Sequence, residues 1–166
     1  MPSTPGSLSD ILLGLVDAGV AFILVGGLAA VAQGAPITTF DVDIVPVRTS
    51  DNIDRLLGML ASIDTYYRGR PGGDKLPPDR RALLGTGHSL FMTSLGPLDV
   101  LGCIEGSRGY DELIDHAITI DLSGRLVRVL SLEMLVQLKR ESSHPKDRQA
   151  LPILEATLQR QGRQAR

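Results

Sequence analysis

Two aspartates stand one residue apart inside an aliphatic segment, in the stretch "TTFDVDIV" (38–45). Alternate side chains of a β-strand point to the same face, so Asp41 and Asp43 would lie on one face, roughly 7 Å apart. A third carboxylate, Asp99, occurs in similar surroundings in "PLDVLG". If the strands that carry these residues are neighbours, three carboxylates converge on one face of a sheet. The alternative interpretation of the first two is an ordinary solvated pair at a strand end.

A cluster of carboxylates of this kind needs a cation. Neither strand segment contains Lys or Arg, and crowded carboxylates without a cation repel one another, which raises their pKa values. A divalent cation would relieve the repulsion, and Mg²⁺ prefers a few carboxylate oxygens together with substrate phosphates. The pattern therefore predicts a Mg²⁺ site, with Mn²⁺ as an alternative, where a phosphate is held and polarised while a hydroxyl is aligned.

A glycine pair, Gly26 and Gly27, follows the aliphatic run "VAFILV" and precedes "LAAVAQ", which predicts a short helix. A strand-to-helix turn at this pair would expose backbone N–H groups and a helix N-terminus, both of which favour phosphate. An ordinary tight turn is the alternative. Because thirteen residues separate the pair from Asp41, the combined pattern would put phosphate donors beside metal ligands.

These residues resemble the nucleotidyltransferase superfamily with the DNA polymerase β-like fold, whose motif is Gly-Gly or Gly-Ser followed by Asp-x-Asp. The resemblance rests on "VGGLAAVAQG…TTFDVDIV". Within the superfamily the chain is similar to small, toxin-associated bacterial nucleotidyltransferases of the AbiEii/MenT-like type. "LDVLG" matches the place of their third carboxylate, and "VLSLEMLVQLKRESSHPKDRQAL" matches their C-terminal segment. The resemblance covers roughly residues 10–155.

The resemblance implies a fold of the α/β (α+β) class, a mixed β-sheet flanked by helices. It also implies roles for individual residues. Asp41 and Asp43 would bind Mg²⁺, and Asp99 would complete the metal-binding triad and act as base on the incoming hydroxyl. Gly26 and Gly27 would hold the phosphates of a nucleotide. The implied reaction is in-line attack of an acceptor hydroxyl on the α-phosphate of an NTP, with release of pyrophosphate.

The resemblance also implies contacts to the triphosphate from the C-terminal segment. Lys139 and Lys146 are the candidates, with Asp147 orienting them. The alternative for Lys139 is a surface lysine at a helix C-terminus, where the helix dipole favours a cation.

One position departs from the pattern of these proteins, which often carry an arginine four residues before the first aspartate. Here that place is Ile37. A basic phosphate contact is then missing, or it comes from the loop 68–81. Thr38 and Thr39 are candidates for hydroxyl contacts to the nucleotide.

The pattern of apolar and turn-forming residues predicts the elements that position these groups. We expect one nucleotidyltransferase-like domain over 1–166, in which 131–166 is a C-terminal helical segment. Pro152 predicts a kink or break in the last helix. An exposed loop is expected at 69–87, where glycine and proline are frequent. Strands are expected at 20–25, 41–47 and 65–69, twice in 88–102 and as a hairpin in 118–131, and helices at 7–19, 28–33 and 50–63, with Ser50 as cap.

Composition and charge restrict the setting and the partners. The start has no secretory signal pattern, no apolar run approaches the roughly 20 residues of a membrane span, and the single cysteine suits the cytoplasm. The segment 68–81 carries five basic and two acidic residues, and the segment 139–166 carries seven basic and three acidic residues. Both segments could contact a phosphate-bearing partner such as RNA or tRNA; solvated loop and tail are the alternative.

Three functions are compatible with these observations. The first is a Mg²⁺-dependent nucleotidyltransferase that acts on RNA or tRNA in a toxin–antitoxin setting, with a cognate antitoxin as partner. The second is transfer of the nucleotidyl group to a small molecule or to a hydroxyl of a partner protein. The third is a catalytically silent protein that binds a nucleotide or a partner.

Overall fold

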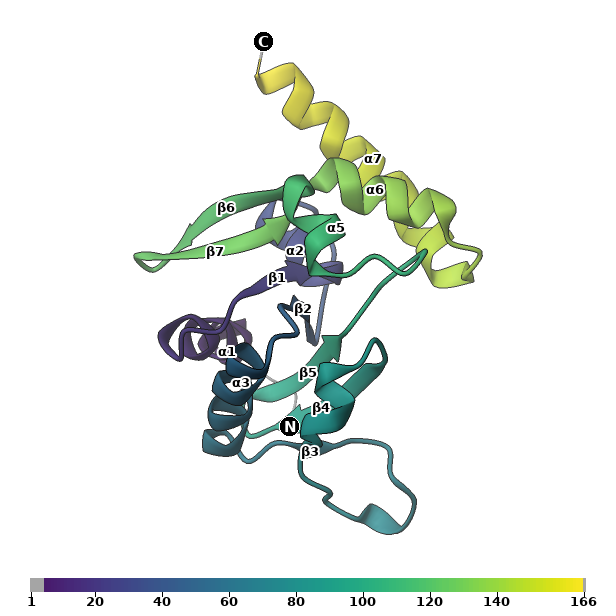
Figure 1. The fold of residues 1–166 in the computed structure, drawn as a ribbon. Coiled ribbons are helices and arrows are strands. Elements are labelled where there is room, and N and C mark those ends of the chain that lie inside the picture. The colour runs from purple at the N-terminus through teal and green to yellow at the C-terminus, as the bar shows by residue number, and fades with distance from the viewer. Residues whose placement is uncertain (1–4, 166) are drawn as a thin grey trace.

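The computed structural model describes residues 5–165. Within this range seven strands form one mixed sheet in the order β3-β4-β5-β2-β1-β7-β6 (Figure 1). The strands are β1 (Phe22–Val25), β2 (Val42–Pro46), β3 (Tyr66–Tyr67), β4 (His88–Thr93), β5 (Gly96–Leu101), β6 (Ala117–Leu122) and β7 (Arg125–Leu130). The helices are α1 (Pro5–Asp17), α2 (Gly26–Ala32), α3 (Ser50–Ser62), α4 (Arg80–Leu84), α5 (Tyr110–Leu113), α6 (Leu132–Glu141) and α7 (Pro145–Gln164).

Strand β2 lies at the centre of the sheet and organises it. It pairs antiparallel with β1 and parallel with β5, and β4 pairs antiparallel with β5. The short strand β1 is buried along its whole length, which explains its uniformly aliphatic sequence, because a strand covered on both faces loses the alternation of apolar and polar residues. The predicted mixed sheet with flanking helices is confirmed.

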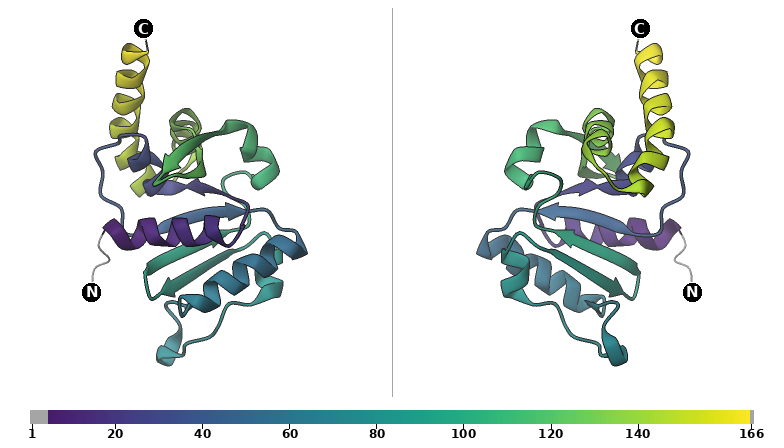
Figure 2. Two further views of the ribbon diagram at one scale, coloured as in Figure 1. Left: turned by 90° about the vertical axis from the view of Figure 1, so that its left-hand side faces the viewer. Right: turned by 90° about the vertical axis from the view of Figure 1, so that its right-hand side faces the viewer.

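Helices α1 and α3 pack against one face of the sheet (Figure 2). Their apolar stripes supply fully buried side chains to the core, among them Ile11 and Leu15 of α1 and Ile53, Leu56 and Leu60 of α3. Helices α6 and α7 pack against each other, and α6 also contacts α2, beyond the β1 side of the sheet (Figure 1). Among the described residues, no helix combines the length and apolar composition needed to cross a membrane.

The segment 69–87 is more ordered than the loop that its glycines and prolines predict. It contains a 3-10 turn (Pro71–Gly73) and helix α4. The side chain of Asp79 caps α4 by accepting a hydrogen bond from the N–H of Arg81, and Leu83 is buried. The expectation of a wholly exposed loop is therefore wrong, because one apolar side chain anchors the second half of the segment to α3.

Two further expectations about helices need correction. The cap of α3 is Thr49, whose hydroxyl accepts the N–H of Asn52, and not Ser50. Helix α7 continues through Pro152 without a break. The proline removes one backbone hydrogen bond, but Leu154 and Thr157 beyond it are buried and hold the following turns against the core.

The side chain of Gln33 joins the glycine-led helix α2 to the start of α6. Its amide Nε2 donates to the carbonyls of Ala29 and Leu130, at 3.0 and 2.9 Å, and its Oε1 accepts the N–H of Leu132 at 2.9 Å. The backbone carbonyl of Gln33 accepts a hydrogen bond from the side-chain amide of Gln161 in α7. One residue thus connects α2 to both C-terminal helices.

We expect Gln33→Leu to lower the free energy of unfolding by about 1–3 kcal/mol, because it leaves the N–H of Leu132 and the carbonyl of Leu130 without partners. Denaturation with urea measures the loss. Gln137→Leu is the matched control, since the Gln137 amide makes one exposed hydrogen bond, 3.3 Å long, to Glu141. Equal stabilities for the two variants would contradict the role of Gln33.

Candidate active site

The parallel pairing of β2 with β5 brings the three predicted carboxylates together. Asp43 and Asp99 are direct register partners, and Asp41 precedes Asp43 by two residues. One carboxylate oxygen from each of the three lies within 4.8 Å of the others. The two strands are more than 50 residues apart in sequence, so only the sheet creates this cluster.

Asp99 is the most enclosed of the three, with 8% of its surface exposed. Its Oδ1 is buried. The Nη1 of Arg68 lies 2.6 Å from this oxygen in an ion pair and also donates a hydrogen bond to the carbonyl of Phe91 at 2.8 Å. Asp99 therefore already has a cation beside one of its carboxylate oxygens.

Arg68 is the charged neighbour that the sequence analysis missed. The register of β3 on β4 pairs Tyr66 with Met92 and Tyr67 with Phe91, so Arg68 follows β3 opposite Leu90, to whose carbonyl it donates its own N–H. From there its side chain reaches across β4 to β5. Two indirect signals were present in the sequence, the strand predicted at 65–69 and the basic segment 68–81 named as a candidate source of a phosphate contact, but no local pattern identifies Asp99 as the partner of Arg68.

Burial and mutual repulsion dominate the electrostatics of the cluster. Burial, followed by the charges of Asp41 and Asp99, raises the pKa of Asp43 to about 8. Burial and the charge of Asp99 also raise the pKa of Asp41, and Arg68 opposes this shift. Without a further cation, the protein holds part of this cluster protonated near neutral pH.

The three side chains fit a divalent cation. They offer oxygens close enough to share one ion, and even with Arg68 beside Asp99 the cluster lacks enough positive charge to keep all three carboxylates ionised. Oxygen-only ligands of this kind suit Mg²⁺ or Mn²⁺. Asp41, Asp43 and Asp99 would hold the ion.

The glycine pair lies directly against the carboxylates. Gly26 and Gly27 are the first two residues of α2, and Gly26 has a φ of +73°. A Cβ on Gly26 would lie 2.1 Å from Oδ2 of Asp43, and one on Gly27 would lie 3.1 Å from Oγ1 of Thr39. The absence of a side chain at Gly26 is therefore what lets the backbone approach the carboxylate of Asp43.

A small cavity of about 130 Å³ begins at these residues and ends at the C-terminal helices. Gly26 and Asp43 line one side, and Lys139 and Asp147 line the other. The remaining wall is mostly apolar: Val25, Leu101, Ile104, Leu135 and Leu138, with Glu105 as its remaining charged member.

Lys139 and Asp147 form an ion pair at this cavity. The Nζ of Lys139 lies 2.5 Å from Oδ1 of Asp147, and the hydroxyl of Ser142 donates to Oδ2. Although burial opposes the shift, the hydrogen bonds from Lys139 and Ser142 lower the pKa of Asp147. Asp147 thus holds the Lys139 ammonium group at the cavity wall.

The other predicted contact residues lie less favourably. Lys146 is exposed and does not line the cavity. Thr38 is exposed, whereas Thr39 is half-buried and its hydroxyl points toward the carbonyl of Asp41 at 3.4 Å. Ile37 is half-buried and packs against the core, so the position where an arginine was expected is structural in this chain.

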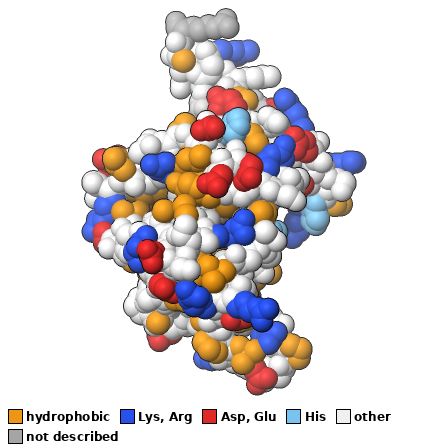
Figure 3. Space-filling view, in the orientation of Figure 1, with side chains coloured by type: hydrophobic (Ala, Val, Ile, Leu, Met, Phe, Trp, Pro, Cys, Tyr) orange, Lys and Arg blue, Asp and Glu red, His pale blue; other side chains and the backbone are white. Residues whose placement is uncertain are grey.

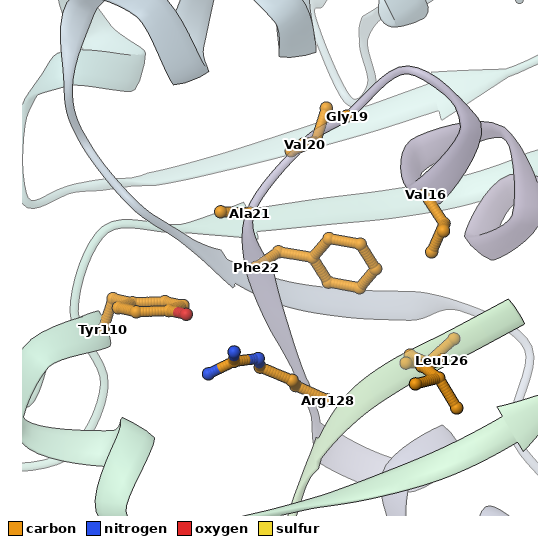
Figure 4. A pocket seen from close by; sticks show the side chains of 9 residues that line it. Val16, Gly19, Val20, Ala21, Phe22, Tyr110, Leu126 and Arg128 are labelled. Carbon is orange, nitrogen blue, oxygen red and sulfur yellow. The ribbon is translucent and has the colours of Figure 1, made fainter.

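A second cavity, of about 280 Å³, lies at the opposite end of β1 (Figure 4). Phe22, Tyr110 and Arg128 line it together with aliphatic and backbone groups. Its lining contains no carboxylate, so it offers a divalent cation no ligand set comparable to the aspartate cluster. The length of β1 separates it from Gly26.

Comparisons with known proteins identify the fold. The chain resembles the lincosamide antibiotic adenylyltransferase LnuA, solved with lincomycin bound, with a TM-score of 0.63 and 15% identity over 95% of this chain and 99% of LnuA. It resembles TM1012, a putative nucleotidyltransferase from Thermotoga maritima, with a TM-score of 0.56 and 14% identity over 98% and 96% of the two chains. It also resembles the antibiotic-resistance factor ANT(2'')-Ia, with a TM-score of 0.57 and 12% identity over 93% of this chain and 86% of that protein.

Sequence comparison adds nothing to this likeness, because no family model and no curated protein matches the chain. At identities of 12–15%, the structural likeness is evidence for the fold. The chain has the nucleotidyltransferase fold, as its sequence predicts.

We expect Gly26→Ala to displace Asp43 and to weaken Mn²⁺ binding by tenfold or more, because the new methyl group occupies the space of a metal ligand. Gly34→Ala is the matched control, since Gly34 also has a positive φ, of +94°, but a Cβ there meets open space. Calorimetric titration with Mn²⁺ measures both variants. Equal affinities would mean that strain at positive φ, and not the contact with Asp43, is all that alanine adds.

We expect the metal-free protein to lose stability as pH rises from about 5 to about 8. The pKa of Asp43 is raised from 3.8 to about 8 in the folded state, so in this range the folded protein binds a proton that the unfolded chain has released. Stability then falls with pH, by at most about 1.4 kcal/mol per unit for one group.

Urea denaturation in EDTA, repeated across this pH range, measures the slope. Asp43→Asn should flatten it, and added Mg²⁺ should reverse the loss by favouring the ionised carboxylates. A stability that rises with pH in EDTA, or a slope that Asp43→Asn leaves unchanged, would contradict the raised pKa.

Proposed function

We propose that this protein is a metal-dependent nucleotidyltransferase that moves an NMP group from an NTP to an acceptor hydroxyl and releases pyrophosphate. One observation carries the proposal. Three carboxylates, two from the β2 segment and one from β5, share a partly buried cluster in which Arg68 is paired with Asp99 and the positive charge is too small to keep all three ionised. Such a cluster is costly unless it binds a cation. The nucleotidyltransferase fold supports the same conclusion.

The chain's own residues would bind and orient the nucleotide. The cavity between Gly26 and Lys139 is bounded by backbone that a phosphate can approach closely and by an ammonium group already held in place by Asp147. The aliphatic wall beside Lys139 suits the uncharged part of a nucleotide. Mg²⁺ bound by the three aspartates would neutralise phosphate charge and polarise the phosphorus–oxygen bond.

Most of the rate enhancement would come from positioning and electrostatics. Asp99 is the candidate base for the acceptor hydroxyl, because β5, which carries it, lies on the other side of β2 from the strand β1 that leads to Gly26. Lys139 would contact the triphosphate. Lys146, which is exposed, would contact it only at the rim, and Thr38 and Thr39 remain candidate contacts from the segment before Asp41.

RNA or tRNA is one candidate acceptor, in the toxin–antitoxin setting that the AbiEii/MenT-like resemblance implies, with a cognate antitoxin as partner. The basic residues of 68–81 and 139–166 support it. Several of them already have acidic partners, however: Arg68 with Asp99, Arg80 with Asp54 and Arg140 with Glu155. On the face drawn in Figure 3, basic side chains are interspersed with acidic ones.

A small-molecule hydroxyl is the second candidate acceptor. The chain matches almost the whole length of LnuA, a lincosamide adenylyltransferase solved with lincomycin bound, so a chain of this length can hold both a nucleotide site and a small acceptor. A catalytically silent nucleotide-binding protein is the remaining alternative. Retention of all three carboxylates in one cluster favours the active form.

The test is incubation with each α-³²P-labelled NTP, Mg²⁺ and either total RNA or the small-molecule fraction of a bacterial extract. We expect the wild type to transfer label and an Asp41→Asn/Asp43→Asn variant to transfer at least about a thousandfold less, because the metal site carries most of the electrostatic stabilisation. The asparagines keep size and shape, so loss of folding is not expected.

The control variant is Asp121→Asn, which changes an exposed carboxylate near the end of β6 and should transfer label as the wild type does. If the wild type binds NTP but transfers label to no fraction, the protein is the silent form. If it binds no NTP, the proposed site itself is wrong.

A further inference from the structure

The aspartate cluster is continuous with a second surface on the same face of the sheet. Directly paired residues of antiparallel strands lie on one face, and Asp99 pairs with Leu90 of β4. Two residues along β4, Met92 pairs with Tyr66 of β3. We call these three side chains, Tyr66, Leu90 and Met92, the β3–β4 platform.

The platform is uncovered, unlike the same face over β1. Leu90 is 43% exposed, and Met92 and Tyr66 are half-buried, whereas the alternate residues of β4 are buried against the opposite face. Over β1, the same face is closed by α6, whose Leu135 and Leu138 form a cavity wall with Val25. An apolar sheet face left open beside a charged cluster is a candidate binding surface.

Two basic side chains border the platform. The backbone of Arg68 lies opposite Leu90, and its guanidinium group lies beside Asp99. The side chain therefore connects the platform to the carboxylates. Lys75, from the segment after β3, lies over the ring of Tyr66, with its Nζ 5.1 Å from the ring centre. The Tyr67 hydroxyl accepts the N–H of Asp79, which fastens this segment to the sheet edge.

The geometry of nucleotidyl transfer assigns the two sides of the cluster. The attacking and leaving oxygens lie roughly in line with the phosphorus. The cavity with Gly26 and Lys139 extends from the end of β1 to the end of β5 at Leu101, whereas the platform lies on β4 and β3, on the far side of Asp99 from β1. If the triphosphate and its leaving pyrophosphate occupy the cavity, the acceptor must approach from the platform.

We propose that the β3–β4 platform binds the acceptor, and that the acceptor is a small hydroxylated molecule with an apolar body. The inference rests on the proposed nucleotidyl transfer and adds its substrate class. The apolar body packs on Leu90, Met92 and Tyr66, and the hydroxyl points to Asp99, which takes its proton as the hydroxyl oxygen bonds to the α-phosphorus and pyrophosphate leaves.

The chemistry of the platform favours this occupant over RNA. Two of its three side chains are aliphatic, whereas single-stranded nucleic acid is bound by aromatic side chains along a basic groove. Of the two basic residues at its border, Arg68 already faces Asp99. An RNA strand would leave the aliphatic surface uncovered and would meet few free cations beside the carboxylates.

The experiment compares Leu90→Gln and Met92→Gln with the wild type in the labelled-NTP assay, supplied with the small-molecule fraction of a bacterial extract at limiting concentration or with total RNA. Ile118→Gln is the matched control, since Ile118 is 41% exposed on β6, at the other end of the sheet. Leu90→Met tests whether an apolar side chain is sufficient. Thermal melting checks the folding of each variant, and NTP binding is titrated separately.

We expect label in the small-molecule fraction, and transfer lowered about tenfold or more by each platform variant, because each loses one apolar contact with the acceptor. NTP affinity should stay within about twofold, and Leu90→Met and Ile118→Gln should transfer as the wild type does. Label in RNA alone, or platform variants as active as Ile118→Gln, would overturn this inference and leave nucleotidyl transfer standing. Absence of transfer by the wild type would overturn the proposed function itself.

Discussion

The crowding of three carboxylates is the constraint on which the rest of the structure depends. The parallel pairing of β2 with β5 puts Asp43 beside Asp99 in a half-buried setting, where two negative charges strongly repel each other. Arg68 supplies the nearest positive charge from the structure, and protonation, seen as the raised pKa of Asp43, relieves part of the remainder. A fold under selection only for stability would gain by replacing these acids with apolar residues of similar size. Their cost is understandable if a cation and a phosphate belong there.

The surroundings of the cluster hold it in a fixed position relative to the cavity between Gly26 and Lys139. Gly26 lets the start of α2 touch Asp43, and Gln33, at the end of the same helix, is hydrogen-bonded to the start of α6. Helix α6 in turn carries Lys139, which Asp147 of α7 holds at the cavity wall. The glycine turn and the ammonium group are therefore connected through one short helix, which suits a site whose parts must be held in one geometry.

The face of the sheet has two different halves around this cluster. On the β1 side it is covered by α6 and forms a cavity with charged and aliphatic walls. On the β4 side it is open and mostly aliphatic, and Arg68 spans from it to Asp99. A reaction that joins two substrates needs two such approaches to one set of carboxylates. The likeness to the folds of LnuA and ANT(2'')-Ia covers 95% and 93% of this chain, so the cavity and the open half belong to one continuous fold.

The local sequence was sufficient for the elements and for the candidate ligands. The alternation of side chains along a strand put Asp41 and Asp43 on one face, and the aliphatic surroundings of Asp99 marked it as a candidate third carboxylate. Both signals depend only on neighbours a few residues away. Local pattern misjudged 69–87, where glycines and prolines hid α4, since the burial of Leu83 that anchors it comes from α3. It also could not find Arg68 or separate Lys139 from Lys146. The order of the strands decided that Arg68 meets Asp99, that Lys139 and not Lys146 lines the cavity, and that Leu90 lies open beside the carboxylates. These relations join residues far apart in sequence, and only the pairing and packing of whole strands and helices brings them within contact distance.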